Sequence, residues 1–135
     1  HEVLGLDPTL AFCSQAASRV PGRVLRGDMR NLPVGSGTLG GIWACASLLH
    51  VPREHVDDTL AEFARVLQPD GPVTLSVKEG DGVMSNPDSP YESDDREFTL
   101  FGRDELRTRL GDAGFSVDVV DTNDDWLVVH ALLAQ

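Results

Sequence analysis

The chain has 135 residues, of which 41% are hydrophobic and 24% charged, and these proportions are typical of one soluble globular domain with its own core. Acidic residues outnumber basic residues by 22 to 11, and the formal net charge of −11 opposes binding to nucleic-acid phosphates or anionic lipids. No apolar run reaches the roughly 18 residues of a membrane helix and no signal-peptide pattern opens the chain, so we expect a cytoplasmic protein without nucleic-acid or membrane partners.

The two cysteines, Cys13 and Cys45, both lie in apolar stretches of the sequence. Neither belongs to a CxxC pair, and neither has a histidine at the spacing of a metal ligand. We therefore predict that both are small core residues, and that the protein holds no metal ion and no disulfide.

The first part of the chain predicts alternating strands and helices. Residues 2–6 form a short apolar strand that ends at Asp7-Pro8, a dipeptide suited to the start of a helix. Residues 9–19 carry apolar side chains at helical spacing. Residues 23–26 then predict a second strand, which ends in Gly27-Asp28-Met29.

A central stretch, residues 40–52, begins as an apolar run without polar alternation, which is typical of a parallel strand covered on both faces. The run passes into the small residues Ala46 and Ser47 and then reaches His50 before Pro52 ends it. Ligands of open α/β sheets bind at the carboxyl ends of strands. We therefore predict that residues 46–50 form the floor of a cofactor pocket.

Patterning continues through the second half as a helix at 53–67, a strand at 73–77, a helix at 104–112 and a closing hairpin of strands at 116–121 and 126–133. In the turn Pro69-Asp70-Gly71, we expect the glycine to take the left-handed conformation. Residues 79–96 are polar and lack periodicity, so we interpret them as a lid or substrate-facing loop. This order predicts a Rossmann-like three-layer α/β/α sandwich, whose mostly parallel sheet ends in an antiparallel hairpin.

The ends of three predicted strands carry groups that suit an adenosine site. The Asp7 carboxylate can accept hydrogen bonds from both hydroxyls of a ribose, although a plain role as a helix cap would explain an aspartate at this position equally well. Gly27 permits close backbone approach, the Asp28 carboxylate can accept a hydrogen bond from an exocyclic amine, and Met29 offers an apolar surface to a flat ring. An ordinary strand-to-loop turn would also explain that tripeptide. His50 titrates near neutral pH, although a lone histidine is more often structural than catalytic.

The sequence resembles the class I S-adenosylmethionine-dependent methyltransferases over nearly the whole chain. The resemblance lies in Val3-Leu4-Gly5-Leu6-Asp7-Pro8, Gly27-Asp28-Met29-Arg30-Asn31-Leu32-Pro33, the stretch from Gly41-Ile42-Trp43 to His50, and Glu62-Phe63-Ala64-Arg65-Val66-Leu67-Gln68-Pro69-Asp70-Gly71. Residues 101–115 and the closing hairpin also resemble the family's C-terminal half. The resemblance implies S-adenosylmethionine as cofactor and methyl transfer to an oxygen or nitrogen of a small-molecule nucleophile.

The resemblance also implies a role for each candidate residue. Asp7 would bind the ribose hydroxyls, Asp28 would bind the adenine amino group, and Met29 would flank the adenine. Residues 46–48 would line the cofactor near its sulfonium, and His50 would face the methyl acceptor as a general base. The cofactor-binding residues implied in this way are Asp7, Pro8, Asp28, Met29, Ala46, Ser47 and Leu48.

The sequence departs from the family pattern at two places. The family's first strand and glycine-rich loop would precede His1, so we expect residues 1–135 to be a single N-terminally truncated domain, or a variant that completes its sheet from a partner, including a homo-oligomer. Gly40 stands where many members carry an acid. A non-catalytic binding or oligomerisation module and a fragment of a nicotinamide-dependent Rossmann oxidoreductase remain alternatives. A phosphoacceptor receiver domain would need paired acids at its first strand end, where only Asp7 stands.

Overall fold

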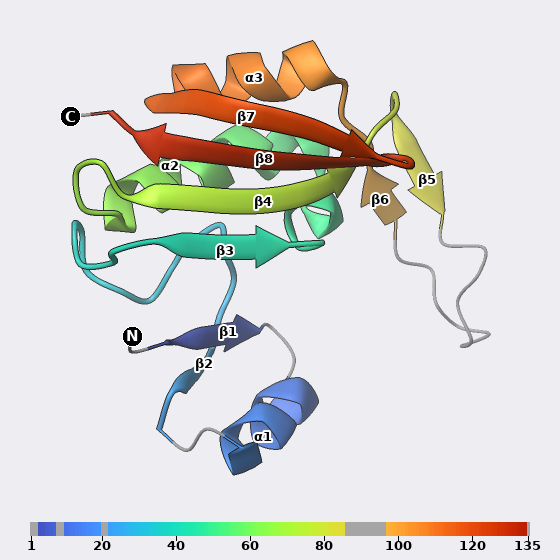
Figure 1. Cartoon of the computed structure of the whole chain (residues 1–135). Helices are drawn as coiled ribbons and strands as arrows, with labels where there is room; N and C mark the ends of the chain where they lie inside the picture. The colour runs from blue at the N-terminus through green and yellow to red at the C-terminus, as the bar shows by residue number, and fades with distance from the viewer. Residues whose placement is uncertain (1–2, 8–9, 20–21, 86–96, 135) are drawn as a thin grey trace.

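The computed structural model of the chain describes residues 3–7, 10–19, 22–85 and 97–134. Its largest sheet has four strands in the order β3-β4-β8-β7 (Figure 1). These strands are β3 (Ile42–Cys45), β4 (Pro72–Lys78), β8 (Trp126–Leu133) and β7 (Phe115–Asn123). β3 and β4 are parallel, whereas β8 pairs antiparallel with both β4 and β7. The predicted order, with parallel strands before an antiparallel hairpin, is confirmed.

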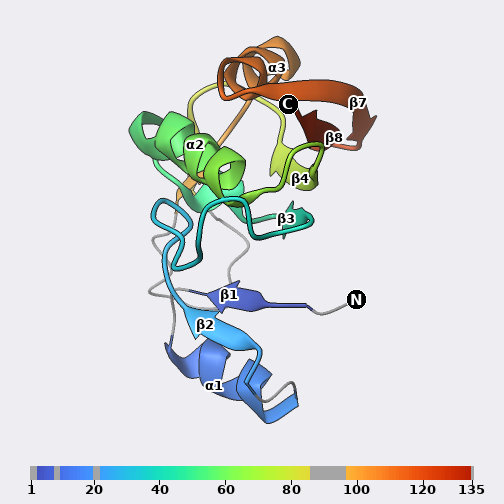
Figure 2. The same ribbon diagram turned by 90° about the vertical axis from the view of Figure 1, so that its left-hand side faces the viewer.

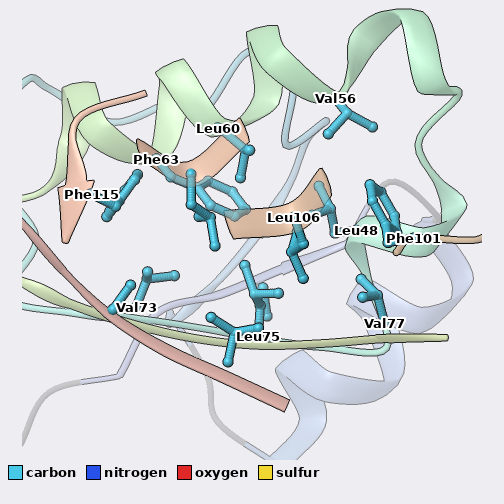
Figure 3. Close-up of a cluster of buried hydrophobic side chains, with 14 of the residues drawn as sticks. Leu48, Val56, Leu60, Phe63, Val73, Leu75, Val77, Phe101, Leu106 and Phe115 are labelled. Atoms are coloured by element: carbon cyan, nitrogen blue, oxygen red, sulfur yellow. The ribbon is translucent and has the colours of Figure 1, made fainter. Parts of the chain in front are cut away.

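Two α-helices cover one face of this sheet (Figure 2). They are α2 (Val56–Val66), which follows the short 3-10 turns η1 (Leu48–His50) and η2 (Arg53–His55), and α3 (Arg103–Asp112). Leu60 and Phe63 of α2 and Leu106 of α3 meet Val73 and Leu75 of β4 in the hydrophobic core (Figure 3). Because the buried residues of α2 recur every three or four positions, its sequence pattern fixes which side faces the sheet.

A smaller unit contains the first two strands and α1 (Leu10–Arg19). Here β1 (Gly5–Asp7) and β2 (Val24–Arg26) form a parallel two-stranded sheet, with Asp7 opposite Arg26. β1 starts later than the predicted strand at residues 2–6. β1 and β3 run in the same direction, as Figure 1 shows.

The interpretation of residues 79–96 as an irregular loop is wrong at its first part. β5 (Val83–Ser85) pairs antiparallel with β6 (Glu97–Thr99), so the described ends of this segment form a hairpin. Residues 86–96 lie outside the described residues. In the closing hairpin, β7 is longer than the predicted strand at residues 116–121, whereas β8 has the predicted bounds. Asp124 adopts a φ of 56° at their tip, and this left-handed conformation suits a two-residue hairpin turn.

The turn after α2 does not have the predicted conformation. Asp70, rather than Gly71, takes the left-handed conformation, with a φ of 64°. Position 71 requires glycine for a steric reason, because a Cβ there would lie only 2.8 Å from the carbonyl oxygen of Gln68. Aspartate tolerates the left-handed region better than most residues, so it can occupy the preceding position.

The central strand is covered on one face only within the described part of the chain. Ala44 is buried in the core, but Trp43 is 80% exposed and Cys45 is also exposed. The expectation of a strand covered on both faces, and that of a buried Cys45, are therefore wrong, whereas Cys13 is buried as predicted. Successive side chains of a strand point to opposite faces. Ala44 belongs to the core cluster that includes residues of α2 and α3, so these two helices cover its face of the sheet. None of the described helices has the length and apolar character needed to cross a membrane.

Candidate functional site

The carboxyl ends of β1, β2 and β3 lie along one edge of the molecule, because these strands run in the same direction. Asp7 is the last residue of β1, and Asp28 follows the end of β2 by two residues. Ala46 and Ser47 directly follow β3. The fold therefore brings three of the predicted segments to one edge. Pro8 and the side chain of Asp7 lie outside the described parts of the structure.

Asp28 is paired with Arg30. The Arg30 guanidinium donates through Nε to Oδ1 (3.1 Å) and Oδ2 (2.9 Å), and through Nη2 to Oδ2 (2.6 Å), while the Arg30 N–H donates to Oδ1 (2.9 Å). The hydrogen bonds from the Arg30 side chain are the main reason that the pKa of Asp28 is lowered, and nearby His55 acts in the same direction. The Asp28 side chain is 46% exposed, so its ionised carboxylate can still accept a hydrogen bond from a ligand.

The loop that follows Met29 is anchored on α2 by a pair of charged residues. Glu62 accepts the Leu32 N–H at 2.7 Å and is held by Arg65 through Nε (2.6 Å) and Nη2 (2.9 Å). Arg65 also donates to the carbonyl oxygens of Leu32 and Val34, each at 3.0 Å. The Arg65 hydrogen bonds are the main cause of the lowered pKa of Glu62. Charge-assisted bonds of this kind are stronger than neutral ones and hold the loop on the helix.

Gly27 lies where other parts of the protein pack closely against the backbone. A Cβ at this position would lie 3.0 Å from Cδ1 of Leu6 and 3.3 Å from the ring of Pro33. A side chain at position 27 would therefore require the Leu6 side chain and the Pro33 ring to shift by a few tenths of an ångström.

The turn after β3 is a strained segment. Ala46 has a φ of 52°, which is uncommon for a residue with a Cβ. Its N–H donates to both the carbonyl oxygen (3.2 Å) and the hydroxyl oxygen (2.9 Å) of Ser76 on β4. The Ser47 hydroxyl donates to the Cys45 carbonyl oxygen at 3.0 Å. Backbone conformations of this kind cost about 1–3 kcal/mol and cluster at functional sites.

The two ends of η1 differ in their surroundings. Leu48 is fully buried in the core, so it supports the site from within and does not contact the space where a ligand would bind. His50 is exposed, and its ring packs edge-on against that of Phe98 on β6, with 5.3 Å between centroids and 67° between planes. The structure therefore brings the β5–β6 hairpin to the predicted catalytic histidine.

A cavity of about 890 Å³ lies between β1 and β3. Its lining includes Met29 and Ser47, so these two predicted residues do meet in one place. Asp28 and His50 are not among its lining residues. All the lining residues described are uncharged, and only Ser47 and Thr74 have polar side chains.

Several residues that shape this region escaped the sequence analysis. Arg30 stands two positions from Asp28, and Glu62 and Arg65 have the i,i+3 spacing of helix ion pairs, so both pairings had a local signal. The contact of His50 with Phe98 had none, because the two residues are far apart in sequence. Within the described residues, no group of three or more His, Cys, Asp or Glu side chains is placed to hold a metal ion.

Comparison with known proteins gives a consistent picture. The family model described as a methyltransferase domain matches residues 1–75. The fold is similar to that of 1,6-didemethyltoxoflavin-N1-methyltransferase from Burkholderia thailandensis, crystallised with 1,6-didemethyltoxoflavin and S-adenosylhomocysteine, with a TM-score of 0.79, 24% identity, and coverage of 100% of this chain and 62% of that chain. No curated protein sequence gives a significant match.

Two further solved structures have the same fold. An S-adenosylmethionine-dependent methyltransferase from Methanosarcina mazei aligns with a TM-score of 0.80 and 19% identity, covering 98% of this chain and 82% of that chain. One from Clostridium acetobutylicum ATCC 824 aligns with a TM-score of 0.79 and 11% identity, covering 100% of this chain and 76% of that chain. The chain thus spans less than two thirds of the Burkholderia enzyme, at 62% of its length.

Proposed function

Because the chain belongs to the methyltransferase domain family, we propose that it binds S-adenosylmethionine at the carboxyl edge of β1, β2 and β3 and serves in methyl transfer to a small-molecule oxygen or nitrogen nucleophile. The observation that carries this proposal is the convergence of Asp7, Asp28 and the Ala46 turn at one edge. Family membership favours this function over a nicotinamide-dependent oxidoreductase, which was the other cofactor-binding alternative.

The residues around the end of β2 fit the adenosine part of the cofactor. The Asp28 carboxylate is ionised, half-exposed and held in place by Arg30, so it is ready to accept the adenine amino group. Met29 is partly buried and offers its soft thioether to a flat ring. Asp7 and Pro8 would complete this part of the site at the end of β1, with the Asp7 carboxylate accepting the ribose hydroxyls.

The segment after β3 would border the reactive part of the cofactor. Bound S-adenosylmethionine supplies a methyl group activated by the positive charge on sulfur. The Ala46 turn holds Ser47 at this edge, and the buried Leu48 fixes the turn to the core. The protein's main contribution to such a transfer is to hold the reacting groups at a productive distance and angle.

The acceptor side is proposed to lie around His50. A neutral imidazole can take a proton from an acceptor hydroxyl or amine, and this side chain is exposed at the end of η1. Phe98 packs edge-on against its ring and fixes its orientation. The β5–β6 hairpin would therefore form one wall of the acceptor site, which is the role proposed for part of the predicted lid.

The methionine end of the cofactor has no evident charged partner in the described lining of the cavity, which is uncharged. This end carries an ammonium and a carboxylate, which need polar or charged partners when they leave water. A second candidate function is therefore a non-catalytic binding module, including a homo-oligomer. The observation that favours it is the edge of β3 beside this cavity, since β3 pairs with β4 alone among the described strands.

Calorimetric titration with S-adenosylhomocysteine tests the enzyme proposal. Asp28→Asn keeps the size of the side chain but weakens its acceptor capacity, so we expect its Kd to rise by about tenfold, equivalent to one charge-assisted hydrogen bond. Asp118→Asn, at an exposed position on β7, serves as the matched control and should bind like the parent chain. If the folded parent chain gives no heat, the binding-module candidate is favoured instead.

A further inference from the structure

The β5–β6 hairpin is attached to the segment that carries His50. The hairpin lies at the end of the four-stranded sheet where β3 and β4 end, and η1 follows β3 there (Figure 1). The Phe98 ring packs edge-on against the His50 imidazole, with 5.3 Å between centroids. The Thr99 hydroxyl donates to the carbonyl oxygen of Val51 at 2.7 Å. Two successive residues of β6 therefore contact two successive residues of the turn after β3.

The hydrogen bond from Thr99 to Val51 is buried. Thr99 is 4% exposed and Val51 is 5% exposed, and Thr99 is one of two buried polar residues in the described part of the chain. A buried carbonyl oxygen that loses its hydrogen-bond donor still bears the full cost of its removal from water, so such a bond is hard to break. The Thr99 hydroxyl therefore fixes β6 to the turn.

This attachment limits where the Phe98 ring can lie. Phe98 and Thr99 are neighbours in β6, and β6 pairs with β5 along its whole length. Phe98 is partly buried and packs against the hydrophobic core. With the backbone held at Thr99, only the side-chain torsions of Phe98 remain to place its ring. The contact of Phe98 with His50 therefore depends on the Thr99 hydrogen bond.

The ring contact matters because His50 is exposed. An exposed side chain exchanges between rotamers within nanoseconds, whereas a general base must lie within hydrogen-bond reach of the proton that it takes. Aromatic rings favour the edge-to-face arrangement found here, with 67° between the ring planes. Phe98 thus favours one orientation of the imidazole over the others.

We propose that Thr99 is a positioning residue for His50: its buried hydroxyl holds β6 on Val51, and the Phe98 ring on the same strand then sets the orientation of the imidazole towards the methyl acceptor. The inference rests on the proposed function for the role of His50 as the base. Thr99 acts through Phe98, because its own side chain is buried.

Arg53 supports the same hairpin in a different way. Its guanidinium donates to the carbonyl oxygens of Gly82 (3.1 Å) and Leu100. These residues directly precede β5 and directly follow β6, so Arg53 holds the hairpin at its open end. Loss of the Arg53 donors should loosen the hairpin as a whole, whereas loss of the Thr99 hydroxyl should act first at His50.

The NMR signals of the His50 ring test the proposal, because the ring current of Phe98 shifts imidazole protons that lie near it. The sequence has four histidines, so His50→Gln, which lacks these signals, identifies them. Phe98→Leu removes the aromatic ring and gives the signal positions without the contact. Thr99→Val keeps the branched shape of the side chain and removes the hydroxyl, whereas Thr99→Ser keeps the hydroxyl.

Thr59→Val is the matched control. Thr59 is the other buried threonine among the described residues, and its hydroxyl donates to the carbonyl oxygen of His55 at 2.9 Å. Thr59→Val therefore also takes a buried hydroxyl away from a backbone carbonyl oxygen, but at a place that does not contact β6. It should leave the His50 signals at their parent positions.

We expect the His50 signals of Thr99→Val to move most of the way to their positions in Phe98→Leu, while those of Thr99→Ser stay close to the parent. Signals that stay at the parent positions in folded Thr99→Val would overturn the proposal. If Thr99→Val does not fold, the pair Thr99→Ala and Thr99→Ser, which differ only in the hydroxyl, decides. Displaced signals in Thr99→Ala alone would support the role of the hydroxyl, and equal signals in both would overturn it.

Calorimetric titration with S-adenosylhomocysteine separates this inference from the proposed function. A folded parent chain that gives no heat counts against the proposed function, while the His50 signals still decide whether Thr99 positions the imidazole. We expect Thr99→Val to bind S-adenosylhomocysteine like the parent. A Kd raised about tenfold or more in Thr99→Val would overturn the specific role of Thr99, because the substitution would then disturb the whole site.

Discussion

Ser76 on β4 accepts the N–H of Ala46 twice, through its carbonyl oxygen at 3.2 Å and through its hydroxyl oxygen at 2.9 Å. This arrangement holds an alanine in the left-handed region at the point where β3 ends and the candidate site begins. Ser47 follows directly and His50 stands three residues after Ser47, at the end of η1, so the position of both depends on this turn.

Replacing the Ser76 hydroxyl tests how much it contributes to this turn. We expect Ser76→Ala to lower the free energy of unfolding by about 1 kcal/mol, which is typical of one lost hydrogen bond. Hydrogen exchange at the Ala46 amide should become faster, because only the carbonyl oxygen of residue 76 remains as acceptor. Ser116→Ala, at an exposed position on β7, is the matched control and should change neither quantity. An unchanged Ala46 exchange rate would show that the hydroxyl does not hold the turn.

Glycine substitutions at two neighbouring positions of the same segment should have opposite effects. Ala46 has a φ of 52°, so Ala46→Gly relieves strain and should leave stability unchanged or raise it by up to about 1 kcal/mol. Ala44 is buried within β3, so Ala44→Gly should cost about 1 kcal/mol or more, through backbone entropy and lost packing. Urea unfolding of both variants measures the difference. An equal loss of stability in both would mean that the Ala46 conformation is not strained.

The elements of this fold that are set by local patterning were predictable from the sequence. α2 is an example, since its buried residues recur at helical spacing. It starts later than the predicted helix at 53–67 because the first turn, Arg53–His55, is a 3-10 turn, and it ends at Val66 because Leu67 is extended. The β5–β6 hairpin was not predictable in this way, because its partners Ser85 and Glu97 are separated by a long polar segment. Pairing across such a distance leaves no periodic signal in either short strand.

In the candidate site, too, some features were predictable from the sequence and others depend on contacts between distant residues. The order of strands and helices was enough to bring Asp28 and the Ala46 turn to one edge, because parallel strands place their carboxyl ends together. The exposure of Trp43 could not be predicted from an apolar run, since burial of its face depends on what packs against the sheet. The burial of Leu48 likewise depends on core residues from β4, α2 and α3 that are distant in sequence.

Arg53 should be a main support of the β5–β6 hairpin. Its guanidinium donates to Glu105 and to the carbonyl oxygens of Gly82 (3.1 Å) and Leu100, and lies 5.6 Å from the ring centroid of Phe101. Arg53→Met keeps an apolar stem but removes every donor, so we expect the free energy of unfolding to fall by about 1–3 kcal/mol.

Hydrogen exchange locates the effect of Arg53→Met in the structure. We expect amides of the paired β5 and β6 residues to exchange faster, because the hairpin loses its attachment to α3. Arg107→Met, on the exposed side of α3, is the matched control and should leave both exchange and stability nearly unchanged. Equal effects of the two variants would contradict a special role for Arg53.

The ion pairs of Glu105 should make stability depend on pH in the acid range. Burial alone would raise the pKa of Glu105, but hydrogen bonds from Arg53 and Arg109 outweigh it, so the pKa is lowered. A carboxyl whose pKa is lower in the folded state stabilises the protein above its unfolded pKa, roughly 4.3 for glutamate, and this stabilisation is lost as the pH falls through the folded value. The difference in stability between the parent chain and Glu105→Gln should therefore be full near neutral pH and shrink below roughly pH 4.3.

Urea unfolding of the parent chain and Glu105→Gln at several pH values measures this difference. Glu97→Gln, at an exposed position on β6, is the matched control and should differ from the parent by only a small amount. The expected shrinkage follows from protonation of Glu105, since a neutral carboxyl pairs with Arg53 and Arg109 no better than an amide does. A difference between the parent and Glu105→Gln that stays constant through the acid range would contradict this account, because it would assign the effect of the substitution to packing alone.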